Sequence, residues 1–236
     1  LFNLFQVLIE EGDEVIIPAP YWVTYPEQVK FSDGVPVFID TDDSTEFKIT
    51  PEQLKAVITP KTKVLLLNTP SNPTGSVYTK EELTALGKVL EGTDILVFSD
   101  EMYEKIIYNG TKFTAAAEVS EDMYNRTVTI NGLSKAVAMT GWRFGYIATP
   151  NVALAKALTK LQGQVTSNVN TMTQYAAIPA LEGEADKDIE MMRIEFEKRK
   201  NIAVKSFNEI KGLSTIDPDG AFYLFVNIKE VTNDSM

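Results

Sequence analysis

Residues 63–75 read KVLLLNTPSNPTG, an apolar run that passes directly into a turn rich in Pro, Asn and Gly. Its four consecutive apolar residues, 64–67, suit a strand that is buried on both faces, as in a parallel sheet. A second run of the same kind, ILVF at 95–98, also ends in polar residues. The sequence therefore predicts an α/β fold with a mostly parallel central sheet.

Strand-like runs and helical segments alternate on both sides of this stretch. Strands are predicted at residues 14–17, 35–40, 63–68, 94–99, 126–131 and 144–148. Two helix starts are clearly marked, because Thr50 and Thr79 each stand three residues before a Gln or Glu that completes a capping box. Such alternation is typical of parallel sheets whose strands are joined by helices.

The pattern changes after Pro179. Residues 182–211 form a charged run with apolar residues at helical intervals, which predicts one long helix linking two units. A turn and a strand are predicted within residues 212–228. We expect residues 1–181 to form a large unit that is incomplete at its N-terminus, and residues 182–236 to form the linking helix and the beginning of a smaller, truncated unit. The chain is thus expected to be a fragment that lacks both ends of a longer protein.

Composition limits the chemistry that this chain can carry. It contains neither Cys nor His, which excludes disulfides, the usual zinc ligands and every nucleophile activated by His, so we expect no metal site. Its 22 basic and 33 acidic residues give a net charge of −11, which argues against binding to nucleic acid or to an anionic membrane. Without a long apolar stretch or a signal segment, we expect a cytoplasmic location.

Four polar clusters follow predicted strands, at residues 19–22, 68–75, 99–103 and 131–143. The carboxyl ends of parallel strands meet at one edge of a sheet, where ligands bind in open α/β folds. Each cluster taken alone has an ordinary interpretation, such as a packing corner, a loop, a helix cap or a solvated lysine. Their expected convergence on one edge favours a functional site.

Together the four clusters resemble the class I aminotransferases of the pyridoxal-phosphate (PLP) fold type I superfamily. The run SKAVAMTGWRFGY at 134–146 carries the most specific part, and it is similar to the bacterial aspartate aminotransferase subgroup. NPTG at 72–75 and PYW at 20–22 are less specific. The resemblance extends from Leu1 to about Ile228. It implies PLP as the cofactor, aspartate and 2-oxoglutarate as the expected substrates, and a homodimer whose active sites lie across the interface.

The resemblance implies a role for each candidate residue. Lys135 would hold PLP covalently and carry protons between the substrate α-carbon and C4′ of the cofactor. Asp100 would pair with the protonated pyridine nitrogen, which keeps the ring electron-withdrawing. Tyr103 and Asn72 would form hydrogen bonds with the phenolate oxygen O3′.

Two further residues complete the implied cofactor site. Trp22 would stack on the face of the ring, and Arg143 would bind the phosphate with its planar guanidinium fork. The alternative for Arg143 is a surface ion pair. Trp22 and Asn72 are also expected to touch the substrate carboxylate, whereas residues 220–223 are expected to be structural.

Some features depart from the family pattern. The glycine-containing phosphate turn would precede Leu1, the arginine that binds the substrate α-carboxylate would follow Met236, and Gly132 stands where some relatives have Ser. Three alternatives stay open: an aminotransferase for aromatic or other amino acids, a PLP-dependent carbon–sulfur lyase, and a non-enzymatic PLP-binding module or inactive fragment. A regulatory module of that kind would carry a basic DNA-binding segment, and none is visible in the sequence.

Overall fold

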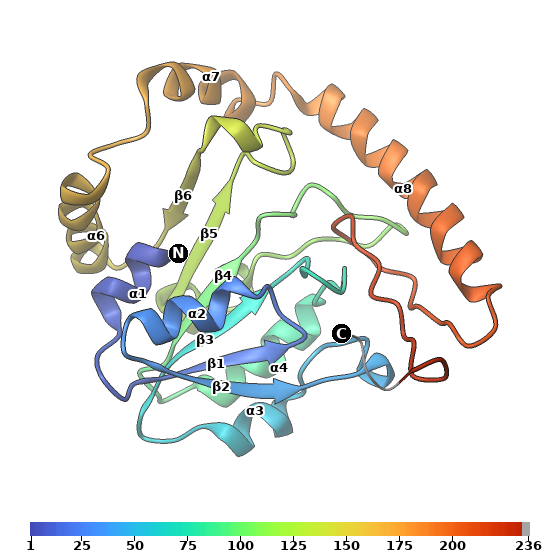
Figure 1. The fold of residues 1–236 in the computed structure, drawn as a ribbon. Helices are drawn as coiled ribbons and strands as arrows, with labels where there is room; N and C mark the ends of the chain where they lie inside the picture. Colours follow the sequence, from blue (N-terminus) through green and yellow to red (C-terminus); the bar gives the residue numbers. More distant parts are fainter. Residues whose placement is uncertain (233–236) are drawn as a thin grey trace.

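The computed structural model, which describes residues 1–232, contains a six-stranded sheet with the order β2-β1-β3-β4-β5-β6 (Figure 1). The strands are β1 (Glu14–Ala19), β2 (Val35–Asp40), β3 (Thr62–Asn68), β4 (Leu96–Asp100), β5 (Thr127–Gly132) and β6 (Gly145–Ala148). Neighbours from β2 to β5 are parallel, and only β6 runs antiparallel to its neighbour. The predicted α/β class and the mostly parallel sheet are confirmed, and the six strands predicted between residues 14 and 148 are all present.

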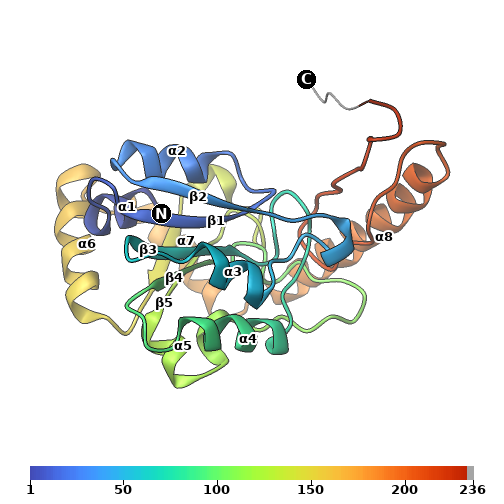
Figure 2. The ribbon, with the colours of Figure 1, turned by 90° about the horizontal axis from the view of Figure 1, so that it is seen from below.

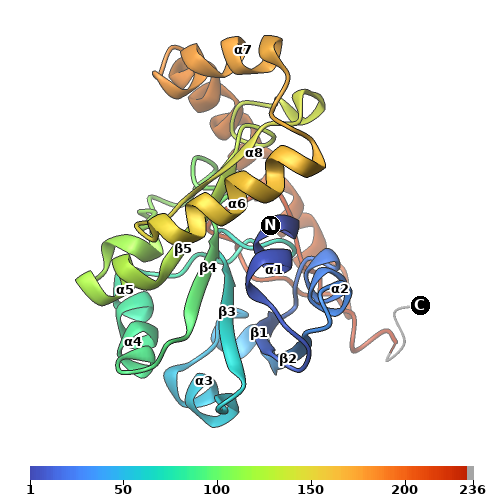
Figure 3. The same cartoon turned by 90° about the vertical axis from the view of Figure 1, so that its left-hand side faces the viewer.

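Helices cover both faces of the sheet, as the buried strands require. Figures 2 and 3 show α1 (Phe2–Leu8), α2 (Thr24–Phe31) and α6 (Val152–Val165) on one face, with α3 (Pro51–Val57), α4 (Lys80–Leu90) and α5 (Glu121–Arg126) on the other. Successive side chains of a strand point to opposite faces. Val64 and Leu66 therefore join the core under the first group of helices, while Leu65 and Leu67 join the core under the second.

Both predicted capping boxes are present. Thr50 Oγ1 accepts a hydrogen bond from the Gln53 amide at 3.2 Å, and the Gln53 side chain accepts one from the Thr50 amide at 2.9 Å. Thr79 and Glu82 form the same reciprocal pair at the start of α4. These bonds satisfy backbone donors that a helix leaves free at its N-terminus.

The remaining elements are short 3-10 helices and the helices α7 (Thr171–Leu181) and α8 (Asp186–Asn208). The 3-10 helices occur at η1 (Asp43–Thr45), η2 (Ala116–Glu118) and η3 (Thr140–Trp142). Helix α8 is the predicted long helix, but it is shorter than residues 182–211 because a turn with Gly183 at a φ of 88° separates it from α7. Within residues 1–232, no helix has the length and apolarity needed to span a membrane.

The strand predicted within residues 212–228 is wrong. This segment is extended but makes only two isolated bridges, Ile107 with Gly220 and Ser214 with Asn227. A strand needs a continuous hydrogen-bonded neighbour, and the segment instead crosses from α8 back to the loops beyond β3 and β4 (Figure 1). Residues 233–236, the last part of the predicted second unit, lie outside the described residues.

Candidate functional site

The carboxyl ends of β3, β4 and β5 bring three of the four predicted clusters to one edge of the sheet. In the strand register Asn68 lies beside Asp100, and Asp100 lies beside Ile130, one residue before Asn131. The fourth cluster follows β1, the neighbour of β3 on the other side. Parallel pairing therefore places the polar residues next to one another, as the sequence pattern predicts.

Asp100 is a buried carboxylate at this edge. Its Oδ2 accepts a hydrogen bond from the Tyr25 hydroxyl at 2.8 Å, and its Oδ1 accepts one from the Met102 amide at 3.3 Å. Burial raises the pKa of Asp100, while the bonds from Tyr25 and Met102 oppose that effect. A carboxylate has room for further donors after accepting two bonds, so Asp100 can still bind a cationic N–H group.

Asn68 ties the NPTG loop to the end of β4. Its side-chain nitrogen donates to the Asp100 carbonyl at 2.9 Å, and its side-chain oxygen accepts from the Asn72 amide at 2.7 Å. The loop is closed by backbone bonds from Ser71 to Ser76 and from Gly75 to Ser71, both 3.0 Å long. These bonds hold the half-buried Asn72 beside the end of β4, where Asp100 lies.

Tyr103 follows β4 and lies in a series of turns. Its side chain is buried, with its hydroxyl 2.7 Å from the hydroxyl of Tyr223. Burial, the nearby Tyr223 hydroxyl and the charge of Asp100 raise the pKa of Tyr103, while the Asn72 side chain lowers it. Tyr103 therefore keeps its proton near neutral pH and can donate a hydrogen bond.

Lys135 follows β5 and is half-buried. Its Nζ lies 5.9 Å from the centroid of the Tyr103 ring and 5.6 Å from the centroid of the Phe222 ring. Ammonium groups are attracted to aromatic faces at such distances. A hydrogen bond of 2.6 Å from Thr140 to the Ser134 carbonyl closes the loop that carries the lysine. The amine is thus held beside the candidate phenol.

Arg143 lies just before β6 in the left-handed region, with a φ of 55°. Its exposed guanidinium donates to the Thr140 carbonyl at 2.7 Å. Across residues 1–232 it forms no ion pair with a carboxylate, so the surface ion pair considered for it is not found there. A guanidinium has five N–H donors in a planar fork, which leaves several for an anion.

Trp22 is 39% exposed and lies against Tyr25, with ring centroids 5.3 Å apart and an interplanar angle of 89°. It is therefore one side chain away from Asp100, because Tyr25 donates to that carboxylate. The structure brings Trp22, Asn72, Asp100, Tyr103 and Lys135 to the same edge of the sheet. Arg143 lies at the far end of the loop that begins with Lys135.

Sequence reasoning missed two tyrosines of the site. Tyr25 stands three residues after Trp22 at the beginning of α2, so helical spacing offered a signal that both face the same way. Tyr223 offered none, because it lies 120 residues after Tyr103 in a segment interpreted as structural.

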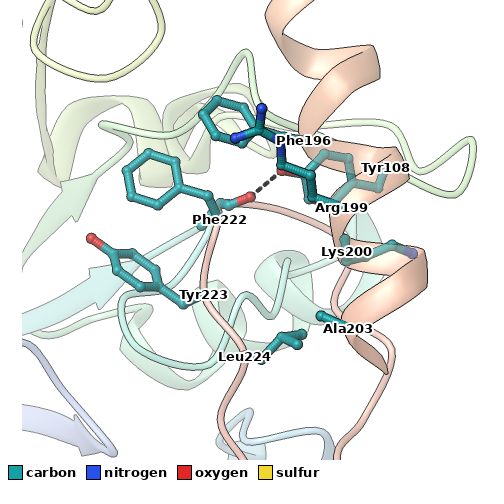
Figure 4. Close-up of a pocket in the computed structure, with 9 residues that line it drawn as sticks. Tyr108, Phe196, Arg199, Lys200, Ala203, Phe222, Tyr223 and Leu224 are labelled. Atoms are coloured by element: carbon teal, nitrogen blue, oxygen red, sulfur yellow. Dashed lines mark hydrogen bonds between the residues drawn. The ribbon is translucent and has the colours of Figure 1, made fainter. Parts of the chain in front are cut away.

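The segment that carries Tyr223 also borders a cavity of about 350 Å³ next to α8. Figure 4 shows the Tyr108 hydroxyl donating to a carbonyl of this segment, which is that of Ala221, and Tyr223 on the side away from α8. The aromatic contact continues from α8 into the site, since Phe196 contacts Phe222 and Phe222 contacts Tyr103. Phe222 thus lines the cavity and also lies beside the Lys135 amine.

The chemistry of these residues fits PLP, the cofactor that the resemblance implies. A buried carboxylate suits a protonated ring nitrogen, and a phenol with a nearby amide suits a phenolate oxygen. An amine suits an aldehyde, and a guanidinium suits a phosphate. Each of these groups is present among the side chains described above.

Comparison with known proteins gives a consistent result. The family model described as aminotransferase class I and II matches residues 1–236. The chain is 52% identical over 230 residues to an aspartate aminotransferase of Geobacillus stearothermophilus and 51% identical over the same length to one of Bacillus subtilis. In each case the match covers 98% of this chain and 58% of the relative, so the chain spans little more than half the length of these relatives.

Solved structures agree with the sequence comparison. The fold matches a crystal structure of the aspartate aminotransferase of Rhizobium meliloti with a TM-score of 0.94 and 41% sequence identity. That match covers 98% of this chain and 57% of the other. The six-stranded, mostly parallel sheet therefore matches aspartate aminotransferase structures of fold type I.

Proposed function

The chain belongs to the aminotransferase class I and II family, and we propose that the complete protein transfers the amino group of an L-amino acid to a 2-oxo acid with the help of PLP. Aspartate is the proposed donor and 2-oxoglutarate the proposed acceptor, in line with the names of the relatives. The observation that carries the proposal is the grouping of Lys135, Tyr103 and Asp100 at the carboxyl ends of β4 and β5.

PLP, when bound, withdraws electrons from the α-carbon of an amino acid and so makes its α-proton acidic. We assign to Asp100 the task of binding the protonated ring nitrogen. The bond from Tyr25 stabilises the charged carboxylate in this buried position, which favours retention of the proton on the ring.

Lys135 is the proposed point of covalent attachment; once the amino group of the substrate has displaced its Nζ from the cofactor, the freed amine would accept the α-proton of the substrate. Tyr103 would donate to O3′ of the cofactor, since it keeps its proton near neutral pH. Asn72 would support the same oxygen and touch the substrate carboxylate. Arg143 would bind the phosphate, and Trp22 would cover the ring and contact the substrate.

The proposal is tested by adding aspartate to the purified complete protein loaded with PLP. We expect the visible absorption of the bound cofactor to give way to the near-ultraviolet absorption of its amino form, with one equivalent of oxaloacetate released. Addition of 2-oxoglutarate should then restore the visible band. A Lys135→Ala variant should do neither, while the exposed Lys160→Ala serves as a matched control.

A different result would support the lyase alternative. If a β-substituted amino acid released pyruvate and ammonia while aspartate left the visible band unchanged, the transfer function would be rejected in favour of elimination.

We also propose that residues 1–181 form the cofactor-binding unit and that α8 begins a second unit. The proposal is supported by the position of α8 outside the helical layers that cover the sheet (Figures 1 and 2). Helix α7 exposes large apolar side chains three residues apart, namely Met172, Tyr175, Ile178 and Leu181. Because exposed apolar patches mark interaction surfaces, we propose that this helix contributes to a homodimer.

A further inference from the structure

We infer that Tyr223 is a positioning residue of the cofactor site, which donates a hydrogen bond to Tyr103 and thereby directs the Tyr103 proton toward the cofactor. The inference rests on the proposed function and deepens it. It assigns a role in the site to a segment that lies after α8, more than a hundred residues along the chain from Tyr103.

The contact itself is direct. The two hydroxyl oxygens are 2.7 Å apart, and the rings of Tyr103 and Tyr223 meet edge to face with centroids 5.7 Å apart. Tyr103 is 4% exposed, so water has little access to compete for its hydroxyl. Lys135 Nζ lies over the same Tyr103 ring, which places the contact beside the proposed attachment point.

The position of Tyr223 is fixed by backbone contacts outside the site. The Gly220 amide donates to the Gly75 carbonyl and the Ala221 amide donates to the Ile106 carbonyl, both at 2.9 Å. The NPTG loop and the segment that carries Tyr223 cross so closely that each needs a glycine. A Cβ at Gly75 would lie 2.8 Å from the Gly220 oxygen, and a Cβ at Gly220 would lie 2.7 Å from Pro70 Cβ. The Tyr108 hydroxyl holds the same segment through the Ala221 carbonyl.

The direction of the Tyr103–Tyr223 bond decides what Tyr103 can do. A hydroxyl has one proton to donate and lone pairs with which to accept. If Tyr103 donated to Tyr223, it would have no proton for O3′ of the cofactor. If Tyr223 donates, Tyr103 accepts that bond and keeps its own proton for O3′, and hydrogen bonds arranged in series in this way strengthen one another.

The consequence concerns the ionisation of the nitrogen that joins Lys135 to the cofactor. A proton on this nitrogen is stabilised by negative charge on O3′, and a donor to O3′ weakens that attraction. Loss of the Tyr223 hydroxyl should weaken donation by Tyr103 and therefore raise the pH at which the nitrogen loses its proton. The protonated, positively charged form of this nitrogen therefore persists to a higher pH.

The test measures the visible absorption of the bound cofactor against pH in the complete protein. We expect Tyr223→Phe, which keeps the ring and removes only the hydroxyl, to raise the midpoint by about half a pH unit. Tyr103→Phe should raise it further, and the double variant should match Tyr103→Phe alone, because Tyr223 acts through Tyr103. Tyr124→Phe, which removes an exposed hydroxyl on α5 away from the site, should leave the midpoint unchanged.

The outcomes separate the inference from the function on which it rests. A wild-type protein with no visible band after loading with PLP would overturn both. A wild-type band whose midpoint is the same in Tyr223→Phe would overturn the inference and leave the function standing. A shift that persists at full size in the Tyr103→Phe background would also overturn it, because Tyr223 would then act by another route.

Discussion

Asp100 and Glu101 are neighbouring acidic residues that are both buried but accept hydrogen bonds from different donors. Asp100 accepts from Tyr25 and lies at the candidate site. Glu101 accepts from the Ser99 hydroxyl at 2.8 Å and from the Ala116 amide at 3.2 Å. Burial raises the pKa of Glu101 to about 7. The sequence pattern identified Asp100, but it gave no means of distinguishing a second buried carboxylate with a structural role.

The raised pKa of Glu101 predicts a dependence of stability on pH. The folded protein keeps this proton up to about pH 7, whereas the unfolded chain releases it near the ordinary value of 4.5. The stability associated with the protonated group is therefore complete below about pH 4.5 and is lost as the pH rises to about 7. A shift of this size corresponds to about 3 kcal/mol in the free energy of unfolding.

We accordingly expect Glu101→Gln to remove this part of the pH dependence. Urea unfolding of the cofactor-free protein should give nearly equal stabilities for variant and wild type at pH 5, and a more stable variant at pH 8. Glu91→Gln alters an exposed carboxylate and serves as the control. Equal stabilities of Glu101→Gln and wild type at both pH values would refute the prediction.

The crossing of the NPTG loop with the segment after α8 depends on Gly75. Its φ of 73° is unfavourable for other residues, and an added Cβ would lie 2.5 Å from Pro218 Cβ. Gly92 shares the positive φ, at 76°, but a Cβ there would meet nothing within 4 Å. Substitutions at Gly75 and Gly92 therefore distinguish the energetic cost of backbone strain from that of a steric clash.

We expect Gly92→Ala to cost about 1 kcal/mol of unfolding free energy through strain alone. Gly75→Ala should cost about 1–3 kcal/mol more because of the clash, and it should also displace Tyr223. Equilibrium unfolding measures both costs. Equal losses in the two variants would show that the crossing is not tightly packed.

Helices and strands were predicted correctly where the sequence pattern that marks them lies within the element itself. The capping boxes at Thr50 and Thr79 marked the beginnings of α3 and α4, and continuous apolar runs marked β3 and β4. The segment at 212–228 was mispredicted as a strand, because its apolar residues pack against α8 and the site without a neighbouring strand. Composition alone does not record which partner an extended segment meets.

The grouping of four candidate side chains at one edge of the sheet was predictable because parallel strands bring their carboxyl ends together. Asn72, Asp100, Tyr103 and Lys135 could each be placed at this edge from their position after a strand. The contact between Tyr103 and Tyr223 could not, because it depends on how the chain returns from α8. Long-range crossings of this kind leave only weak traces in the sequence, such as the paired glycines at 75 and 220.

The exposed face of α7 carries the prediction for assembly. We expect the complete protein to sediment as a dimer, and Tyr175→Glu to weaken the dimer at least about tenfold by placing a charge on this apolar face. Lys156→Glu, an exposed change on α6, provides the control. A monomeric wild type, or a dimer unaffected by Tyr175→Glu, would exclude α7 from the interface.

Reduction with borohydride tests most directly whether Lys135 holds the cofactor. The complete protein is loaded with PLP, reduced, digested and analysed by mass spectrometry. We predict one phosphopyridoxyl group on the peptide that contains Lys135, and none in Lys135→Ala treated in the same way. A label on another lysine at equal yield, or no label on the wild-type protein, would contradict the assignment.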